Sequence, residues 1–125
     1  MTRSSRMRVQ LNIWIENPEG KLLFGEGRHQ ILEAIDRHGS LAAAAEALEM
    51  SYRGLWARMR HSEKRLGFRL IESHAGRGPD SGTALTPEGR ALMERYGRLR
   101  RASTEATHKA FDRIFGDSRP RGSSD

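Results

Sequence analysis

The sequence contains no cysteine, few aromatic residues and no long apolar run. Without cysteine there can be no disulfide, no thiolate zinc site and no cysteine nucleophile. No apolar stretch approaches the roughly 18 residues that a membrane-spanning helix needs. The basic start of the chain is not followed by the apolar run of a signal peptide. We therefore expect a soluble protein in the cytoplasm.

Positive charge is what the chain has in excess. Its 125 residues include 22 Lys and Arg against 16 Asp and Glu, which gives a formal net charge of +6. Such an excess favours polyanionic partners, above all nucleic acid. All but three of the basic residues are arginines. Because a genome rich in G and C would raise the arginine content by itself, only the positions of the arginines are evidence for a function.

The composition predicts one domain, residues 8–116, between disordered polar tails at 1–7 and 117–125. Alternation of apolar and polar residues predicts a strand over 8–15, followed by a turn and a returning strand over 21–24. Helical periodicity predicts helices over 28–38, 41–48, 52–66 and 87–115. A short strand over 68–71, a glycine-rich loop over 74–83 and a strand at 84–85 stand before the last helix.

Several single residues mark the ends of these helices. Ser40 and Ser51 are predicted N-caps, and Gly39 and Gly67 are predicted to end the preceding helices. Thr86 is the predicted N-cap of the last helix, with proline at its first position.

Residues 40–66 have the features of a helix-turn-helix. Four alanines at 42–45 let a second helix cross the first one closely, and a sharp turn at 48–50 separates the two. The glycine-rich hairpin that follows would be a wing. The predicted fold is therefore mainly α with small β-hairpins: a winged helix-turn-helix with an N-terminal β-hairpin and a long C-terminal helix.

The second helix of the motif, about 51–66, is expected to lie in the major groove of DNA. Side chains near its start are expected to face base edges, and basic residues farther along the helix and in the wing are expected to contact phosphates. Trp56, beside this polar face, is expected to anchor the helix in the core rather than to stack on DNA. The candidate DNA-binding residues are Ser51, Tyr52, Arg53, Ala57, Arg58, Arg60, Lys64 and Arg77.

The last helix is too long for so small a domain to cover, because 29 residues of helix extend roughly 43 Å. Its apolar residues are expected to pack against a second copy of the chain, which would place two recognition helices on one face of DNA. The sequence thus predicts a homodimer. The candidate dimerisation residues are Leu99, Phe111, Ile114 and Phe115.

Nothing in the sequence predicts catalysis. The five histidines lack the paired spacing of metal ligands, and there is no nucleophile elbow or catalytic triad motif. We expect no metal, no cofactor and no enzymatic activity.

The segment SLAAAAEALEMSYRGLWARMRHSEKRLGFRLIES resembles the helix-turn-helix of LysR-type regulators, and more closely that of ModE-type molybdate regulators. The resemblance covers about residues 9–100 and implies a winged-helix DNA-binding domain that dimerises through its long last helix. Its marks are Ser40 with the alanine run, Ser51-Tyr52-Arg53 with Trp56 at the family's spacing, and Leu85-Thr86-Pro87-Glu88-Gly89 after the wing.

The chain departs from the ModE pattern at two places. Pro79 and Asp80 interrupt the glycine-rich wing, and Asp80 would repel phosphate. ModE regulators also carry C-terminal molybdate-binding domains, whereas this sequence ends at Asp125, so no oxyanion site is carried over and the effector stays unknown. The leading hypothesis is a sequence-specific, homodimeric transcription regulator that binds double-stranded DNA. Two alternatives stay open: an interaction or dimerisation module without specific DNA binding, and a non-specific nucleoid-type binder.

Overall fold

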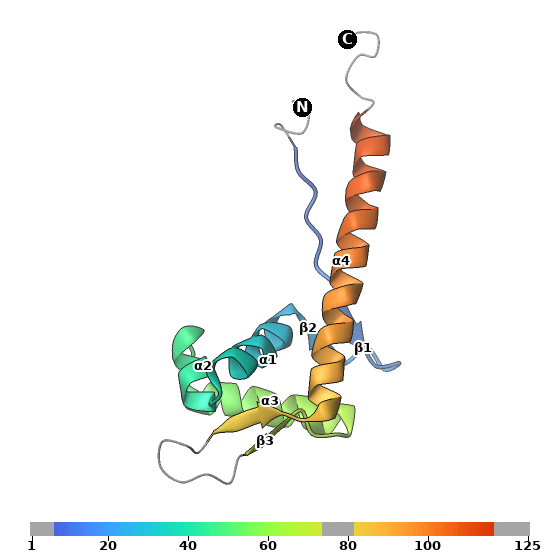
Figure 1. The fold of residues 1–125 in the computed structure, drawn as a ribbon. Coiled ribbons are helices and arrows are strands. Elements are labelled where there is room, and N and C mark those ends of the chain that lie inside the picture. The colour runs from blue at the N-terminus through green and yellow to red at the C-terminus, as the bar shows by residue number, and fades with distance from the viewer. Residues whose placement is uncertain (1–6, 74–81, 117–125) are drawn as a thin grey trace. The chain divides into compact units, whose positions relative to one another are not determined.

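The computed structural model describes residues 7–73 and 82–116 (Figure 1). The chain forms two compact units. One unit is Ile13–Gly97. The other combines Met1–Asn12 with Arg98–Asp125, and its described residues are 7–12 and 98–116. The predicted tails, apart from Met7, and most of the predicted glycine-rich loop lie outside the described residues.

The fold is mainly α-helical with two small β-hairpins, as predicted. β1 pairs antiparallel with β2, and β3 pairs antiparallel with β4. No helix of the described residues is long and apolar enough to cross a membrane. The elements in chain order are β1 (Trp14–Glu16), β2 (Leu22–Gly25), α1 (Glu26–His38), α2 (Leu41–Ala47), α3 (Tyr52–Leu66), β3 (Ile71–Ser73), β4 (Thr83–Leu85) and α4 (Pro87–Phe115).

The helices end close to the residues that the sequence predicts. The side chains of Ser40 and Ser51 each accept a hydrogen bond from the backbone N–H three residues later, so both are N-caps. Gly39 and Gly67 end α1 and α3 in the left-handed conformation, with φ of 79° and 87°. Glycine adopts this conformation without steric cost, which explains why it stands at both positions.

The predicted strand over 8–15 is wrong for most of its length. Trp14, the first residue of β1, pairs with Gly25, the last residue of β2, and α1 begins at the next residue. Among the described residues, those before Trp14 therefore have no strand to pair with. Their alternating pattern is real, but a strand also needs a neighbour along its whole length.

The predicted strand over 68–71 is displaced toward the C-terminus. β3 begins at Ile71 because the buried carboxylate of Glu63 occupies the backbone N–H groups of Leu70 and Ile71, at 2.8 and 3.2 Å. Hydrogen bonds to the Glu63 side chain thus hold the backbone that follows α3, and strand pairing begins only at Ile71.

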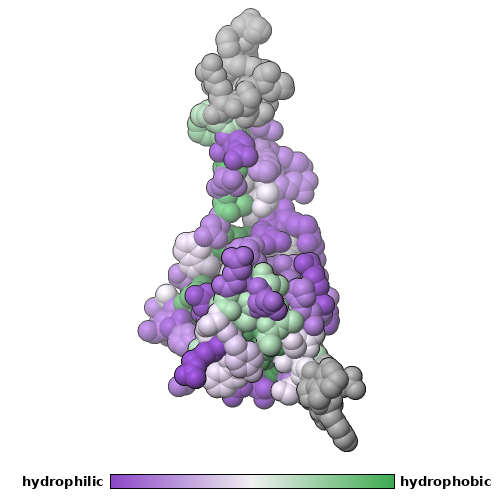
Figure 2. Space-filling model, turned by 90° about the vertical axis from the view of Figure 1, so that its left-hand side faces the viewer, coloured by the Kyte–Doolittle hydropathy of each residue, from purple (hydrophilic) through white to green (hydrophobic). Residues whose placement is uncertain are grey.

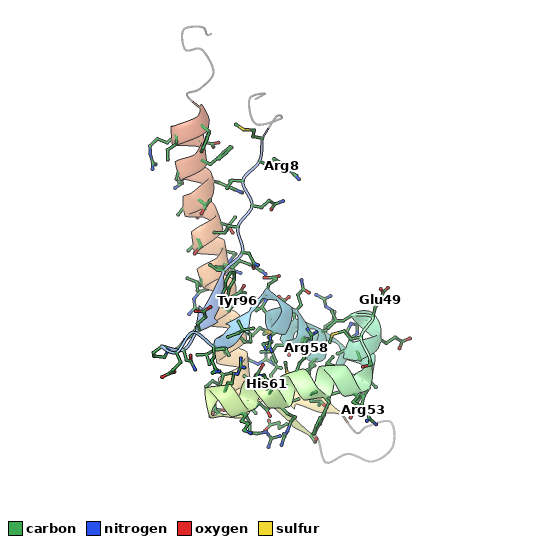
Figure 3. All side chains as sticks on the ribbon, turned by 180° about the vertical axis from the view of Figure 1, so that it is seen from behind. Arg8, Glu49, Arg53, Arg58, His61 and Tyr96 are labelled. Atoms are coloured by element: carbon green, nitrogen blue, oxygen red, sulfur yellow. The ribbon has the colours of Figure 1, made fainter. Side chains whose placement is uncertain are left out.

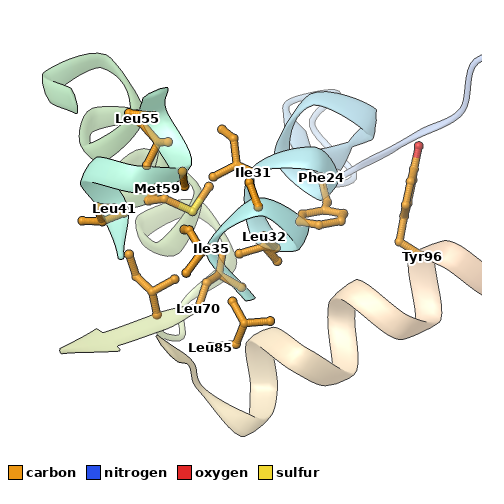
Figure 4. Packing of buried hydrophobic residues seen from close by; sticks show 14 residues of the cluster. Phe24, Ile31, Leu32, Ile35, Leu41, Leu55, Met59, Leu70, Leu85 and Tyr96 are labelled. Carbon is orange, nitrogen blue, oxygen red and sulfur yellow. The ribbon is translucent and has the colours of Figure 1, made fainter. Parts of the chain in front are cut away.

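One hydrophobic core holds the unit Ile13–Gly97 together (Figure 4). Ala44 and Ala45 are buried in it, so the alanine run allows the close approach of α2 that the sequence predicts. Both hairpins contribute to this core as well as all four helices. Its side chains are Phe24, Ile31, Leu32, Ala34, Ile35, Leu41, Ala44, Ala45, Leu55, Met59, Leu70, Ile71, Leu85 and Tyr96.

Tyr96 closes one end of this core. Its ring stands edge-on to Phe24, with 5.4 Å between the ring centroids, and also contacts the ring of His29. Its hydroxyl donates a hydrogen bond to the backbone carbonyl of Ile13 at 2.8 Å. The last turn of α4 within this unit is thereby tied to the residue at which the unit begins.

The base of the wing is joined to the start of α4. The backbone N–H of Thr86 donates to the carbonyl of Leu70 at 2.9 Å, and its hydroxyl accepts from the N–H of Gly89 at 2.9 Å, which confirms the predicted N-cap. A Cβ atom at Gly89 would lie 2.2 Å from that same carbonyl oxygen of Leu70. The close approach of α4 to the hairpin therefore requires glycine.

Candidate nucleic-acid interface

Helices α2 and α3 form the helix-turn-helix. The turn between them puts Glu49 in the left-handed conformation, with φ of 57°, which is uncommon for a residue with a side chain. The backbone N–H of Met50 donates to the carbonyl of Ala45, which closes the turn at 2.9 Å. Ser51 then caps α3. The N–H groups at the start of a helix lack intrahelical acceptors, which favours an anion at that end.

Four of the predicted DNA-binding residues form one exposed row along α3. Arg53, Ala57, Arg60 and Lys64 lie three or four residues apart, on the side of the helix opposite its buried stripe. We call these four residues the α3 row. Figure 3 shows Arg53 at the edge of α3, pointing away from the core. The row presents three positive charges to solvent, with exposed Ser51 and Tyr52 at the start of the helix.

Trp56 is exposed, and the prediction that it anchors α3 in the core is wrong. Its side chain is 46% accessible to solvent. Trp56 directly follows the fully buried Leu55, so it lies about 100° around the helix from the core. The indole lies beside the α3 row, and the guanidinium of Arg60 stands over it, 5.4 Å from the ring centroid.

Glu63 connects the α3 row to the wing, and sequence reasoning missed it. It is 7% exposed, and one of its carboxylate oxygens lies 3.3 Å from Nη1 of Arg60. The other oxygen accepts from the backbone at the start of β3, and Nε of Arg69 lies 3.5 Å from it. The only available signal was the position of an acidic residue one turn after Arg60, beside the apolar stripe. The carboxylate and the indole together hold the Arg60 guanidinium in place.

Arg58 does not belong to the α3 row. It lies on the flank of α3 that faces α1, near Arg28 and Arg65, whereas Arg53 lies at the opposite edge (Figure 3). Lys64 ends the row beside a shallow surface depression that Arg60, Gly67 and Phe68 also line. The predicted wing contact Arg77 lies outside the described residues, as do Pro79 and Asp80.

The surface around the helix-turn-helix is mixed in hydropathy. Figure 2 looks at the side on which α2 lies, where pale green and white residues gather in the middle of the lower half and purple residues surround them. The described residues contain no group of three or more His, Asp or Glu that could hold a metal ion. The arrangement of charges, caps and exposed side chains is suited to contact with a polyanion.

Residues 28–90 match the family model of the bacterial regulatory helix-turn-helix proteins, lysR family. The chain belongs to this family. Its LysR-type helix-turn-helix is a DNA-binding domain of the winged class, as the resemblance implies. The matched range begins in α1 and ends in the first turn of α4, so it contains the α3 row and the base of the wing.

Curated relatives of this LysR-type chain include molybdenum proteins. It is 33% identical to the molybdenum-pterin-binding protein MopA of Rhodobacter capsulatus, over 66% of this chain and 31% of MopA. It is 31% identical to the transcriptional regulator ModE of Haemophilus influenzae, over 65% of this chain and 32% of ModE. These matches confirm the ModE-like resemblance. The chain spans about a third of the length of these relatives.

Two of the similar solved structures are DNA-binding domains in complex with DNA. The CbnR domain is 29% identical, with a TM-score of 0.51, over 75% of this chain and 99% of that one. The BenM domain on the benA site is 25% identical, with a TM-score of 0.51, over 74% of this chain and 98% of that one. They agree with the winged helix-turn-helix architecture described above.

Proposed function

We propose that this protein binds double-stranded DNA in a sequence-specific manner and regulates transcription, with α3 in the major groove. The observation that carries the proposal is the α3 row: three basic side chains on the solvent side of a capped helix. The similarity to two LysR-type domains solved with DNA supports it. The role is binding rather than catalysis, and no cofactor enters it.

The residues of the row differ in what they can read. Arg53, one turn inside the helix start, can reach O6 and N7 of guanine, and Ala57 leaves space for the groove floor. Arg60 reaches the same groove with its guanidinium already oriented by Trp56. Lys64 lies near the end of the helix, where a point charge suits a backbone phosphate.

The proposal includes a homodimer formed through the second half of α4. Leu99 and Ile114 are 44% and 62% exposed. Leu99, Ala106, Ala110 and Ile114 lie on one face of the helix, because successive members of this set are separated by about one or two helical turns. A second copy of this face would cover the two large side chains, and the alanines would let the two helices approach closely. Phe111 and Phe115 stack on each other beside this face, with 5.0 Å between their centroids.

Selection of binding sites from random duplexes tests the function. We expect one enriched sequence with two half-sites about 34 Å apart, or a multiple of that distance. On this site Arg53→Ala should cost about 1–3 kcal/mol and relax the preference at one base pair. Arg37→Ala, at the exposed end of α1, removes the same charge and should have no such effect.

The alternatives give different results in the same experiment. A non-specific nucleoid-type binder would enrich no sequence, although its affinity would fall steeply with salt. An interaction module without DNA binding would retain no duplex in the selection. Either result would contradict the proposal.

A further inference from the structure

Three arginines converge on the flank of α3 that faces α1. Arg58 and Arg65 lie two helical turns apart on the same side of α3. Ser62 lies between them along the helix, and its hydroxyl accepts a hydrogen bond from Nε of Arg28 in α1. The Arg28 side chain therefore reaches the gap between the other two. We call Arg28, Arg58 and Arg65 the flank cluster.

The flank cluster has no counter-charge within the described residues. Across residues 7–73 and 82–116, no carboxylate lies within ion-pair distance of any of its three guanidinium groups. Arg65 is held by a neutral partner, because its Nη1 donates to the backbone carbonyl of Leu22 at 2.9 Å. Elsewhere the fold does pair arginines with carboxylates, as it does for Arg60, Arg69 and Arg90.

This arrangement is electrostatically unfavourable without an anion. Burial, followed by the positive charges of Arg58 and Arg65, lowers the pKa of Arg28 below its ordinary value. The Arg28 side chain is partly buried and hydrogen-bonded, so it cannot move far from the other two charges. An anion seated between the three groups would remove the repulsion. Guanidinium groups offer paired N–H donors that match the oxygen atoms of a phosphate.

We propose that the flank cluster is a phosphate-binding site, separate from the α3 row. The row lies opposite the core, whereas Arg58 and Arg65 lie roughly 100° or more farther around the helix. The phosphate has two sources with the same chemistry: the backbone of the duplex beside the groove that holds α3, or a free phosphorylated small molecule. The first source rests on the proposed function, and the second does not.

Single substitutions in α3 test the site. Arg58→Gln and Arg65→Gln remove one charge each at exposed positions and leave the Arg28–Ser62 contact intact, so both variants should fold. Arg37→Gln, exposed at the end of α1, is the matched control. Circular dichroism during heating checks the fold of all three variants.

The first arm of the test uses inorganic pyrophosphate and the full chain without DNA. Calorimetry should show binding to the wild type and to Arg37→Gln, and binding at least tenfold weaker for Arg58→Gln if the phosphate is a free one. The second arm measures affinity for the selected duplex against salt. If the phosphate belongs to the duplex, the slope of log K against log salt should be less steep by about one for Arg58→Gln, and the base preference should not change.

A change in either arm supports the site and identifies its phosphate source. If the cluster variants match Arg37→Gln in both arms, the proposal is overturned, while sequence-specific binding through the α3 row stands. If the wild type binds no duplex, the proposed function fails, and the pyrophosphate arm alone decides the site.

Discussion

Arg60 enters the α3 row with much of its freedom already removed. A free arginine side chain loses about 2 kcal/mol of rotamer entropy when it is fixed. Here the Trp56 ring lies under its guanidinium and the Glu63 carboxylate holds one end of it. Because Glu63 also accepts from the backbone at the start of β3, the orientation of Arg60 depends on that segment being in place. A side chain fixed before contact has less entropy to lose on binding DNA.

Removal of the Trp56 ring should weaken specific binding more than it weakens the fold. We expect Trp56→Leu to lower the affinity for the selected site several-fold, because an exposed cation–π contact contributes about 0.5–1 kcal/mol. The thermal midpoint should change little, since the ring is largely exposed. Trp14→Leu removes the other exposed tryptophan and serves as the control for fluorescence-based titrations. Equal affinity of Trp56→Leu and wild type would show that the ring does not position Arg60.

Glu49 carries backbone strain that a smaller residue would release. Its φ of 57° is unfavourable for a side chain with a Cβ and ordinary for glycine. Glu49→Gly should raise the free energy of unfolding by about 1 kcal/mol, as measured by urea denaturation. Glu46→Gly, three residues earlier inside α2, should lower it by a similar amount. A loss of stability for both variants would mean that the turn is not strained.

At the scale of elements, two glycines in helices have opposite requirements. A Cβ atom at Gly89 would collide with the backbone of Leu70, whereas one at Gly27 would meet nothing within 4 Å. We expect Gly89→Ala to destabilise the unit by about 3 kcal/mol, because backbone rather than a flexible side chain must move. Gly27→Ala should stabilise it by about 0.5 kcal/mol through helix propensity. Differential scanning calorimetry measures the thermal midpoints of the two variants. A rise of both midpoints would contradict the described packing of α4 on the hairpin.

Helix ends were predictable from the sequence because their determinants are local. A serine cap and a left-handed glycine act within a few residues, so Ser40, Ser51, Gly39 and Gly67 could be placed without knowledge of the fold. Strand limits depend on distant partners. The pairing of β1 stops where β2 ends, and no local pattern contains that information.

The candidate site was predictable only in outline. The spacing of the α3 row follows from helical periodicity, and the row is present. Trp56 lies between the buried side of α3 and its solvent side, where helical periodicity alone does not decide exposure, and the role of Glu63 depends on where the chain turns after Gly67. Both are tertiary effects. The flank cluster was missed because Arg28 comes from another helix, and its contact with Ser62 spans 34 positions of sequence.

At the scale of the whole molecule, the proposed dimer depends on the apolar face of α4. Ile114→Glu should shift the protein from dimer to monomer at micromolar concentration, because it would place a charge in the proposed interface. Arg98→Glu introduces the same residue at an exposed position about 160° around the helix from Ile114, away from Phe111 and Phe115 as well, and should leave the dimer intact. Sedimentation equilibrium without DNA measures both. A wild-type protein that sediments as a monomer at tens of micromolar would rule out the dimer.

The hydrogen bond between Tyr96 and Ile13 has a consequence for engineering. The chain enters the unit Ile13–Gly97 at Ile13 and leaves it after Gly97, the residue next to Tyr96, so the hydroxyl of Tyr96 holds its entry and exit points next to each other. A domain whose two ends emerge together can be inserted into a surface loop of a host protein without stretching either linker. Residues 13–97 therefore define a cassette that a recombinant scaffold could carry between two of its strands, with α3 displayed and a dimeric host holding two copies together.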